Sequence, residues 1–143
     1  PMSALLADSP SEDGREGSAI PEWIDLVSLE PSDRSRLHQN LEKRFDEMLG
    51  SGLIEEVEAL RKNPELHADL PAIRSVGYRQ VWEYLSGEVD KTEMRYKALA
   101  ATMQLGKRQL TWLRAIAGRK TFDPFNPDEL KAAIEYCQQS LKK

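Results

Sequence analysis

The sequence predicts a mostly α-helical chain with two short strands that belong to a larger sheet. Most of its 143 residues fall into segments with apolar residues three and four positions apart, as in amphipathic helices. Two short apolar segments near residues 23–31 and 120–125 have the composition of strands. Because two strands do not form a stable sheet alone, we expect the remaining strands elsewhere in a longer protein. A first residue that is Pro rather than Met favours the same expectation.

The first 31 residues predict a short helix, a loop and a strand. Residues 1–8 are typical of a helix that Ser3 could cap, and residues 9–21 are polar and rich in Gly and Pro, which favours a mobile loop. Pro31 ends the apolar segment that follows. The residues expected to be buried in that strand are Ile24, Leu26, Val27 and Leu29.

Three helices are expected between residues 32 and 85. The first begins near Ser32 and ends at "GSG", where Gly52 suits a left-handed cap. The second covers residues 53–61, and after a loop with two prolines the third covers residues 77–85. The apolar face of the first helix consists of Leu37, Leu41, Phe45, Met48 and Leu49. That of the second consists of Leu53, Val57 and Leu60.

The longest expected helix covers residues 90–116, between a capping pattern of Asp90 with Glu93 and the terminating Gly118. A strand at 120–125 and a final helix at 126–141 follow. The long helix is apolar on most sides, including Met94, Ala98 and Trp112, which predicts that it is packed between other elements. Its polar stripe consists of Lys97, Gln104, Lys107, Arg108 and Thr111. Such donors suit phosphates and base edges, but a packed helix also needs one solvated face.

Charge is distributed unevenly along the chain. Residues 1–70 contain 7 Lys and Arg against 16 Asp and Glu, whereas residues 71–120 contain 10 against 4, within a net charge of −4. The basic segment is a candidate surface for an anionic partner, or equally an ordinary basic surface. One cysteine excludes a disulfide framework, and no apolar run reaches the ~20 residues of a membrane span. A cytoplasmic location without membrane association is therefore predicted.

The stretch "IRSVGYRQVWEYL", residues 73–85, begins the basic segment. Arg74 and Arg79 flank Gly77, and a helix start needs neither arginine. Backbone N–H groups at a helix N-terminus together with arginines favour phosphate binding, although Gly77 could simply start the helix. Tyr78 could stack on a base or pack in the core. The sequence contains no phosphate-loop motif, no cluster of metal ligands and no Ser/His/Asp arrangement.

Three ordered motifs carry a family resemblance. They are "LEKRFDEMLGSGLIEEVEAL", "LHADLPAIRSVGYRQVWEYLSGE" and "ATMQLGKRQLTWLR". Together they resemble the C-terminal part of bacterial tRNA dimethylallyltransferases, also called tRNA isopentenyltransferases. The resemblance implies a P-loop-type α/β core with a helical insertion. It also implies transfer of a dimethylallyl group from dimethylallyl diphosphate to N6 of the adenosine 3′ to the anticodon, after that base is extruded.

The resemblance also implies roles for individual residues. Arg44, in "EKRF", resembles an arginine of the donor channel that stabilises the leaving diphosphate. Residues 67–72 resemble a loop that contacts tRNA. The implied tRNA-binding residues are His67, Asp69, Leu70, Pro71, Arg74, Gly77, Tyr78, Arg79, Gln80, Thr102, Gln104, Lys107, Arg108 and Gln109. Met103 and Gly106 depart from the family pattern, which usually has Arg and often Ala there.

The implied division of the chain places the end of the helical insertion and a loop in residues 1–21. Residues 22–143 are then the C-terminal part of the catalytic core, with tRNA-facing helices in 71–118. Mg²⁺, the phosphate loop and a catalytic aspartate are expected mainly in the N-terminal half, so the chain alone should be inactive. The implied partners are the tRNA anticodon stem-loop and the prenyl diphosphate, with a monomeric parent enzyme. Because the missing strands should leave apolar surface exposed, we also expect the isolated chain to self-associate. The alternative is a stand-alone helical RNA-binding or protein-interaction module without catalysis.

Overall fold

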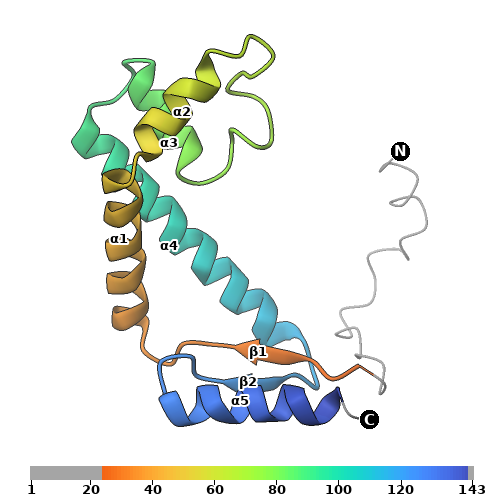
Figure 1. Cartoon of the computed structure of the whole chain (residues 1–143). Coiled ribbons are helices and arrows are strands. Elements are labelled where there is room, and N and C mark those ends of the chain that lie inside the picture. The colour runs from red at the N-terminus through yellow and green to blue at the C-terminus, as the bar shows by residue number, and fades with distance from the viewer. Residues whose placement is uncertain (1–23, 142–143) are drawn as a thin grey trace. The chain divides into compact units, whose positions relative to one another are not determined.

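The structure is a computed structural model, and it describes residues 24–141. The helix and loop expected in residues 1–21 lie outside the described residues. The contacts divide the chain into unit 1, Pro1–Glu30 with Thr111–Lys143, and unit 2, Pro31–Leu110. The elements of both units are labelled in Figure 1. The division into residues 1–21 and 22–143 therefore stays a prediction.

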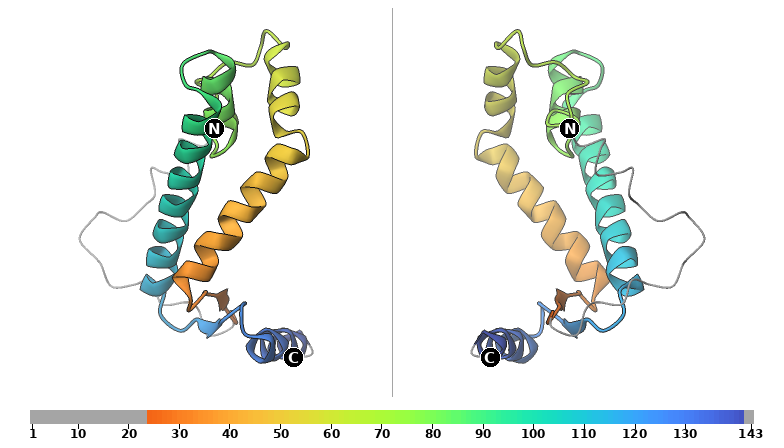
Figure 2. Two further views of the ribbon diagram at one scale, coloured as in Figure 1. Left: turned by 90° about the vertical axis from the view of Figure 1, so that its left-hand side faces the viewer. Right: turned by 90° about the vertical axis from the view of Figure 1, so that its right-hand side faces the viewer.

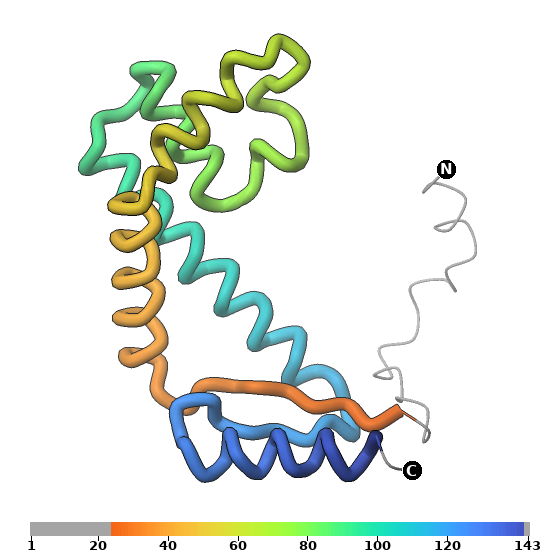
Figure 3. The backbone as a smooth tube through the Cα atoms, in the orientation of Figure 1, coloured from red at the N-terminus to blue at the C-terminus, as the bar shows by residue number. Residues whose placement is uncertain are grey.

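Within residues 24–141, unit 1 contains a two-stranded parallel sheet, the last residues of the long helix and the final helix of the chain. Strand β1, Val27–Leu29, pairs with β2, Lys120–Phe122, so that Val27 lies opposite Lys120. Helix α5, Pro127–Ser140, runs along the strands, as the tube in Figure 3 shows. Asn126 caps α5 by accepting a hydrogen bond from the Asp128 N–H at 3.1 Å. Both predicted strands and the predicted final helix are confirmed.

The expectation that the apolar residues of β1 are buried was wrong in part. Ser28 is 3% exposed, whereas Leu29 is 47% exposed and Ile24 is 40% exposed. Successive side chains of a strand point to opposite faces, so Val27 and Leu29 share one face and Ser28 lies on the other. Val27 and Leu29 line an open apolar groove with residues of α5, which shields them only partly from solvent.

A buried carboxylate joins the elements of unit 1. The side chain of Glu30 is 8% exposed and accepts hydrogen bonds from Arg119 Nε at 2.6 Å and from Ser28 Oγ at 2.9 Å. Arg114 Nε lies 3.8 Å from its other oxygen. Arg119 Nη1 also donates to the carbonyl of Ile116 at 2.8 Å. The cluster therefore ties the end of β1 to the residues that precede β2.

Protonating Glu30 should weaken the fold of unit 1. The hydrogen bond from Arg119 holds the pKa of Glu30 below its ordinary value of 4.5. A carboxyl with a lowered folded pKa contributes stability that is present above its unfolded pKa and is lost as the pH falls through its folded pKa. We expect Glu30→Gln to lower the free energy of unfolding at pH 7 by about 2 kcal/mol. It should also reduce the loss of stability below about pH 4.5, measured by urea denaturation from pH 7 to pH 3.

Glu135→Gln is the matched control for this experiment, because Glu135 is exposed and lies 3.9 Å from Lys131 within α5. An exposed pair of this kind contributes about 0–1 kcal/mol. Stability curves of wild type and Glu30→Gln that run parallel through the acidic range would contradict the role of Glu30.

Unit 2 contains the remaining helices, which follow the predicted boundaries closely. They are α1 (Arg34–Gly50), α2 (Leu53–Arg61), α3 (Tyr78–Leu85) and α4 (Lys91–Ala115), of which α4 continues into unit 1. Asp33 caps α1 by accepting a hydrogen bond from the Arg36 N–H at 3.0 Å. Asp90 accepts one from the Glu93 N–H at 2.8 Å at the start of α4. Two further views of these helices are given in Figure 2.

The core of unit 2 joins all four helices. Its buried members are Phe45, Leu53, Val57, Val81, Met94, Ala98 and Leu99. Met48 was predicted to lie on the same buried face as Phe45, but it is 37% exposed.

The expectation that α4 is packed on most sides was wrong. Tyr96 is 73% exposed and Trp112 is 70% exposed, and the described residues bury no α4 side chain beyond Leu99. An apolar pattern marks residues suited to burial without showing what covers them.

Gly77 has a backbone conformation that is unfavourable for any residue with a side chain. Its φ is +97° and its ψ is −62°, and its N–H donates to Oε1 of Gln80 at 2.8 Å. An added Cβ would meet only Phe45, at 4.0 Å, so the obstacle is the dihedral angle rather than space. We expect Gly77→Ala to lower the free energy of unfolding by about 1–2 kcal/mol, measured by urea denaturation.

Gly106→Ala provides the opposite control. Gly106 lies within α4, and an added Cβ there has nothing within 4 Å. This variant should gain about 1 kcal/mol from helix propensity. Equal losses of stability in the two variants would contradict the assignment of strain to Gly77.

Candidate nucleic-acid interface

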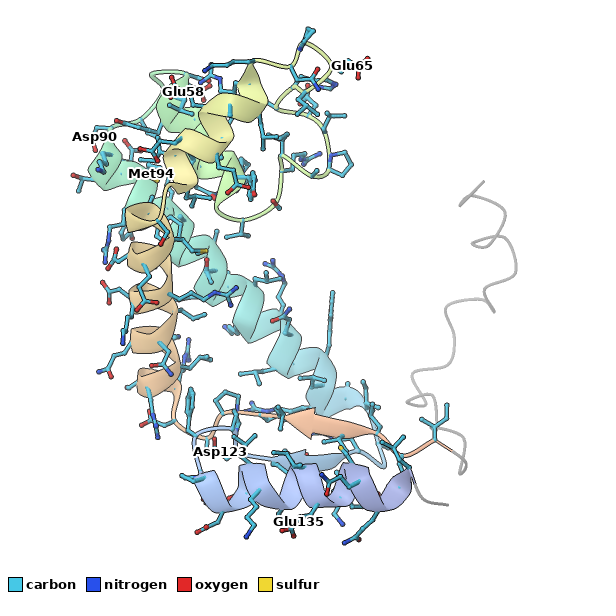
Figure 4. All side chains as sticks on the ribbon, viewed as in Figure 1. Glu58, Glu65, Asp90, Met94, Asp123 and Glu135 are labelled. Atoms are coloured by element: carbon cyan, nitrogen blue, oxygen red, sulfur yellow. The ribbon has the colours of Figure 1, made fainter. Side chains whose placement is uncertain are left out.

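All the predicted site residues fall within unit 2. They lie on three parts of it: α1, which carries Arg44, the stretch of residues 67–80, and the part of α4 between residues 102 and 109. Figure 4 shows the side chains of these elements on the ribbon. One unit therefore carries the whole predicted site.

Residues 67–77 form a series of turns anchored by one buried side chain. The Leu70 N–H donates to the carbonyl of His67 at 3.1 Å, and the Arg74 N–H donates to the carbonyl of Leu70 at 2.9 Å. Ile73 is 3% exposed. Asp69, Pro71 and Arg74 are exposed, as is His67. The loop is thus held by its own backbone hydrogen bonds and presents polar side chains to solvent.

The start of α3 is engaged within the chain. The Tyr78 hydroxyl donates a hydrogen bond to Glu56, which raises the pKa of Tyr78, and its ring packs against the core of unit 2. Gln80 is 2% exposed and holds the Gly77 N–H. That N–H therefore has a partner other than phosphate in this conformation. Arg79 Nε lies 3.7 Å from Glu83. Contacts of these residues with RNA stay predictions.

The predicted residues of α4 differ in exposure. Gln104, Lys107, Arg108 and Gln109 are exposed, whereas Thr102 is half-buried and donates its hydroxyl hydrogen bond to the Ala98 carbonyl at 2.8 Å. Gln104 and Arg108 are four residues apart and so share one face of the helix. These side chains are accessible to a partner of unit 2.

Ion pairs reduce the charge of the basic segment. Lys97 Nζ lies 3.1 Å from Glu93 and 3.9 Å from Glu83. Arg95 pairs with two carboxylates of α1, and both Arg114 and Arg119 pair with Glu30. Arg95, Arg114 and Arg119 are thus paired with acidic residues that lie outside residues 71–120. The net charge summed over residues 71–120 therefore overstates the positive charge that this segment presents on the surface. The exposed guanidinium groups of Arg44, Arg74 and Arg108 have no ion pair within residues 24–141.

The described residues do not fit a Mg²⁺ site. Residues 24–141 contain no group of three or more His, Cys, Asp or Glu side chains that could hold a metal ion. No step is therefore assigned to a metal in this chain. Among the same residues, no helix is both long and apolar enough to span a membrane.

The fold matches solved structures of two bacterial proteins. A tRNA delta(2)-isopentenylpyrophosphate transferase from Staphylococcus epidermidis superposes with a TM-score of 0.72 at 24% identity, covering 82% of this chain and 38% of that one. A tRNA isopentenylpyrophosphate transferase from Bacillus halodurans gives a TM-score of 0.72 at 24% identity, covering 87% and 42%. The fold is therefore that of part of an isopentenylpyrophosphate transferase.

The sequence matches the same class more closely. The chain belongs to the IPP transferase family, whose model matches residues 3–116. It is 76% identical over 143 residues to the tRNA dimethylallyltransferase of Polynucleobacter necessarius and 48% identical over 141 residues to that of Burkholderia cenocepacia. The two matches cover 100% and 99% of this chain, respectively. The chain spans 43% of the length of each relative. The predicted resemblance is confirmed, and the stand-alone module is not favoured.

Proposed function

We propose that this chain is part of a tRNA-modifying prenyltransferase. The enzyme transfers a dimethylallyl group from dimethylallyl diphosphate to N6 of the adenosine 3′ to the anticodon. The observation that carries the proposal is the identity of 76% to a tRNA dimethylallyltransferase along the whole chain. Because the chain spans 43% of that relative, we assign it the tRNA-binding and donor-channel residues and place the phosphate loop, the catalytic aspartate and Mg²⁺ in the rest of the enzyme.

The exposed cations of unit 2 suit the backbone of an anticodon stem-loop. Arg74 extends from the turns of residues 67–77, and Lys107 and Arg108 extend from α4. Guanidinium and ammonium groups bind phosphate oxygens and fix the register of a bound RNA. Gln104 and Gln109 have amides that could hydrogen-bond to base edges exposed by unstacking. The buried members of the predicted set, Gly77 and Gln80, shape the loop in this proposal.

Arg44 suits the donor side of the reaction. In the transfer, the bond between C1 of the dimethylallyl group and the diphosphate oxygen breaks with both electrons going to the oxygen. The N6 lone pair forms the new bond to C1, and N6 then passes one proton to a base, the role we assign to the aspartate in the rest of the enzyme. Negative charge therefore grows on the leaving diphosphate, and an exposed guanidinium beside it stabilises that charge.

The partners follow from this reaction. We expect the full-length enzyme to be a cytoplasmic monomer that binds tRNA and a prenyl diphosphate. We expect the isolated chain to self-associate, because its apolar groove on unit 1, lined by Leu29, Leu130 and Ile134 among others, is exposed.

The test is a prenyl-transfer assay with labelled dimethylallyl diphosphate and an anticodon stem-loop. It compares the full-length protein with this chain alone. We expect label on N6 of the adenosine with the full-length protein only. RNA binding by the full-length protein without transfer would favour the alternative of an RNA-binding module, and transfer by this chain alone would overturn the division of roles.

A further inference from the structure

Three charge-assisted hydrogen bonds connect α4 to α1. Arg95 Nε donates to Asp46 Oδ1 at 2.7 Å, and Arg95 Nη2 donates to Asp46 Oδ2 at 2.8 Å and to Glu42 Oε1 at 2.8 Å. The pair with Asp46 is bidentate, which fixes orientation as well as distance. These hydrogen bonds raise the pKa of Arg95 and lower the pKa of Asp46, so Arg95 and Asp46 are both charged at neutral pH.

The two helices are not in continuous contact beside this arginine. A groove of ≈ 470 Å³ lies next to it, and its lining includes Glu42 and Arg95 together with the apolar side chains of Leu99 and Met103. Near this end of the groove, Phe45 of α1 and Met94 of α4 belong to the same buried core, and Met94 is labelled in Figure 4. The side chains that α1 contributes to this core or packs against it are Phe45 and Leu49, both in the C-terminal half of the helix, so this packing alone leaves the rest of α1 able to turn. A second, directional contact removes that freedom.

Arg44 lies on the other side of α1 from these carboxylates. Glu42 and Asp46 are four residues apart and share one face, whereas Arg44 is two residues from each, which is about 200° of rotation. Holding one face of α1 against Arg95 therefore determines where the opposite face points. Sequence analysis missed this connection, because Arg95 contributes only one unit of charge to the basic segment.

We propose that Arg95 is a positioning residue for prenyl transfer: by clamping Glu42 and Asp46 it sets the rotation of α1 and thereby directs Arg44 toward the leaving diphosphate. The inference rests on the proposed function for its link to the reaction. The claim that Arg95 fixes the rotation of α1 concerns the fold of this chain alone, and it is tested separately from the reaction.

The test uses Arg95→Ala, Arg95→Lys and Asp46→Asn in the full-length protein. Amide hydrogen exchange of α1 reports the clamp directly, and α5 in unit 1 is the internal reference. Prenyl-transfer kinetics give kcat and the KM for the donor, and the Kd for an anticodon stem-loop reports the RNA face of α4. Lys43→Ala is the control, because Lys43 lies on the same helix and pairs only locally with Glu47, at 3.8 Å.

We expect Arg95→Ala to accelerate exchange in α1 but not in α5, and to lower kcat by roughly ten- to a hundredfold, as displacement of a reacting group does. The stem-loop Kd should change by less than about twofold, since the RNA-facing side chains remain. Arg95→Lys should recover only part of kcat, because an ammonium cannot bind a carboxylate in the bidentate manner of guanidinium. Asp46→Asn should reproduce the loss, and its combination with Arg95→Ala should add little.

Unchanged exchange in α1 together with unchanged kcat in Arg95→Ala would overturn the inference. So would a loss that appears equally in α5 exchange and in stem-loop binding, because that pattern describes general destabilisation. A wild-type protein without prenyl transfer would refute the proposed function and the link to the reaction, while exchange would still decide whether Arg95 sets α1.

Discussion

Replacing Arg44 with alanine in the full-length protein is expected to lower kcat for prenyl transfer by roughly 10²–10³-fold, the usual loss when one stabiliser of developing negative charge is removed. Arg44 is exposed on α1, and no ion pair within residues 24–141 occupies its guanidinium. The KM for tRNA should stay close to that of wild type, because the predicted RNA contacts come from other elements. Steady-state kinetics with each substrate varied in turn measure both quantities.

Two variants sharpen this prediction. Arg44→Lys keeps the charge and should recover part of kcat, whereas Lys43→Ala removes a neighbouring charge from the exposed surface of α1 and should leave kcat unchanged. A kcat for Arg44→Ala within about twofold of wild type would be incompatible with a role at the leaving group.

Reversing two charges on α4 should weaken tRNA binding strongly. In Lys107→Glu/Arg108→Glu, two exposed cations become anions that repel the phosphate backbone. We expect the stem-loop affinity to fall by on the order of a hundredfold at low salt, and the slope of log K against log salt to decrease by about two. Binding titrations over a salt series measure both values.

The control for this experiment changes the net charge equally. Lys43→Glu/Lys131→Glu alters two lysines whose side chains are both 78% exposed and which lie outside the predicted interface. It should change the affinity much less than Lys107→Glu/Arg108→Glu does, because neither lysine is a predicted phosphate contact. Similar losses in both double variants would show a general effect of charge instead of contacts by α4.

The helices could be predicted from sequence because their signals are local. Apolar spacing and capping patterns act within a few residues of each other, and the predicted cap Asp90 accepts its hydrogen bond from the Glu93 N–H. The glycine at position 52 likewise has a φ of +102°. Family membership also followed from motifs that are contiguous in the sequence.

The pairing of distant groups could not be predicted in this way. Arg95 and Asp46 are 49 residues apart, and Glu30 and Arg119 are 89 residues apart. No pattern within a few residues of either arginine indicates its partner. The charge counted along residues 71–120 was therefore larger than the charge left unpaired in the folded chain. The exposure of Trp112 was missed for a related reason, since a pattern shows that a side chain is suited to burial but not what lies against it.

The pairing of β1 with β2 has a consequence for the order of folding during synthesis. The strands are neighbours in the sheet, yet the whole of unit 2 is translated between them. At 5–20 residues per second, a ribosome needs about 5–20 s to reach β2 after making β1. The core of unit 2 uses residues from 45 to 99 and is complete within that interval. We therefore expect unit 2 to fold on the nascent chain before β1 can pair with β2.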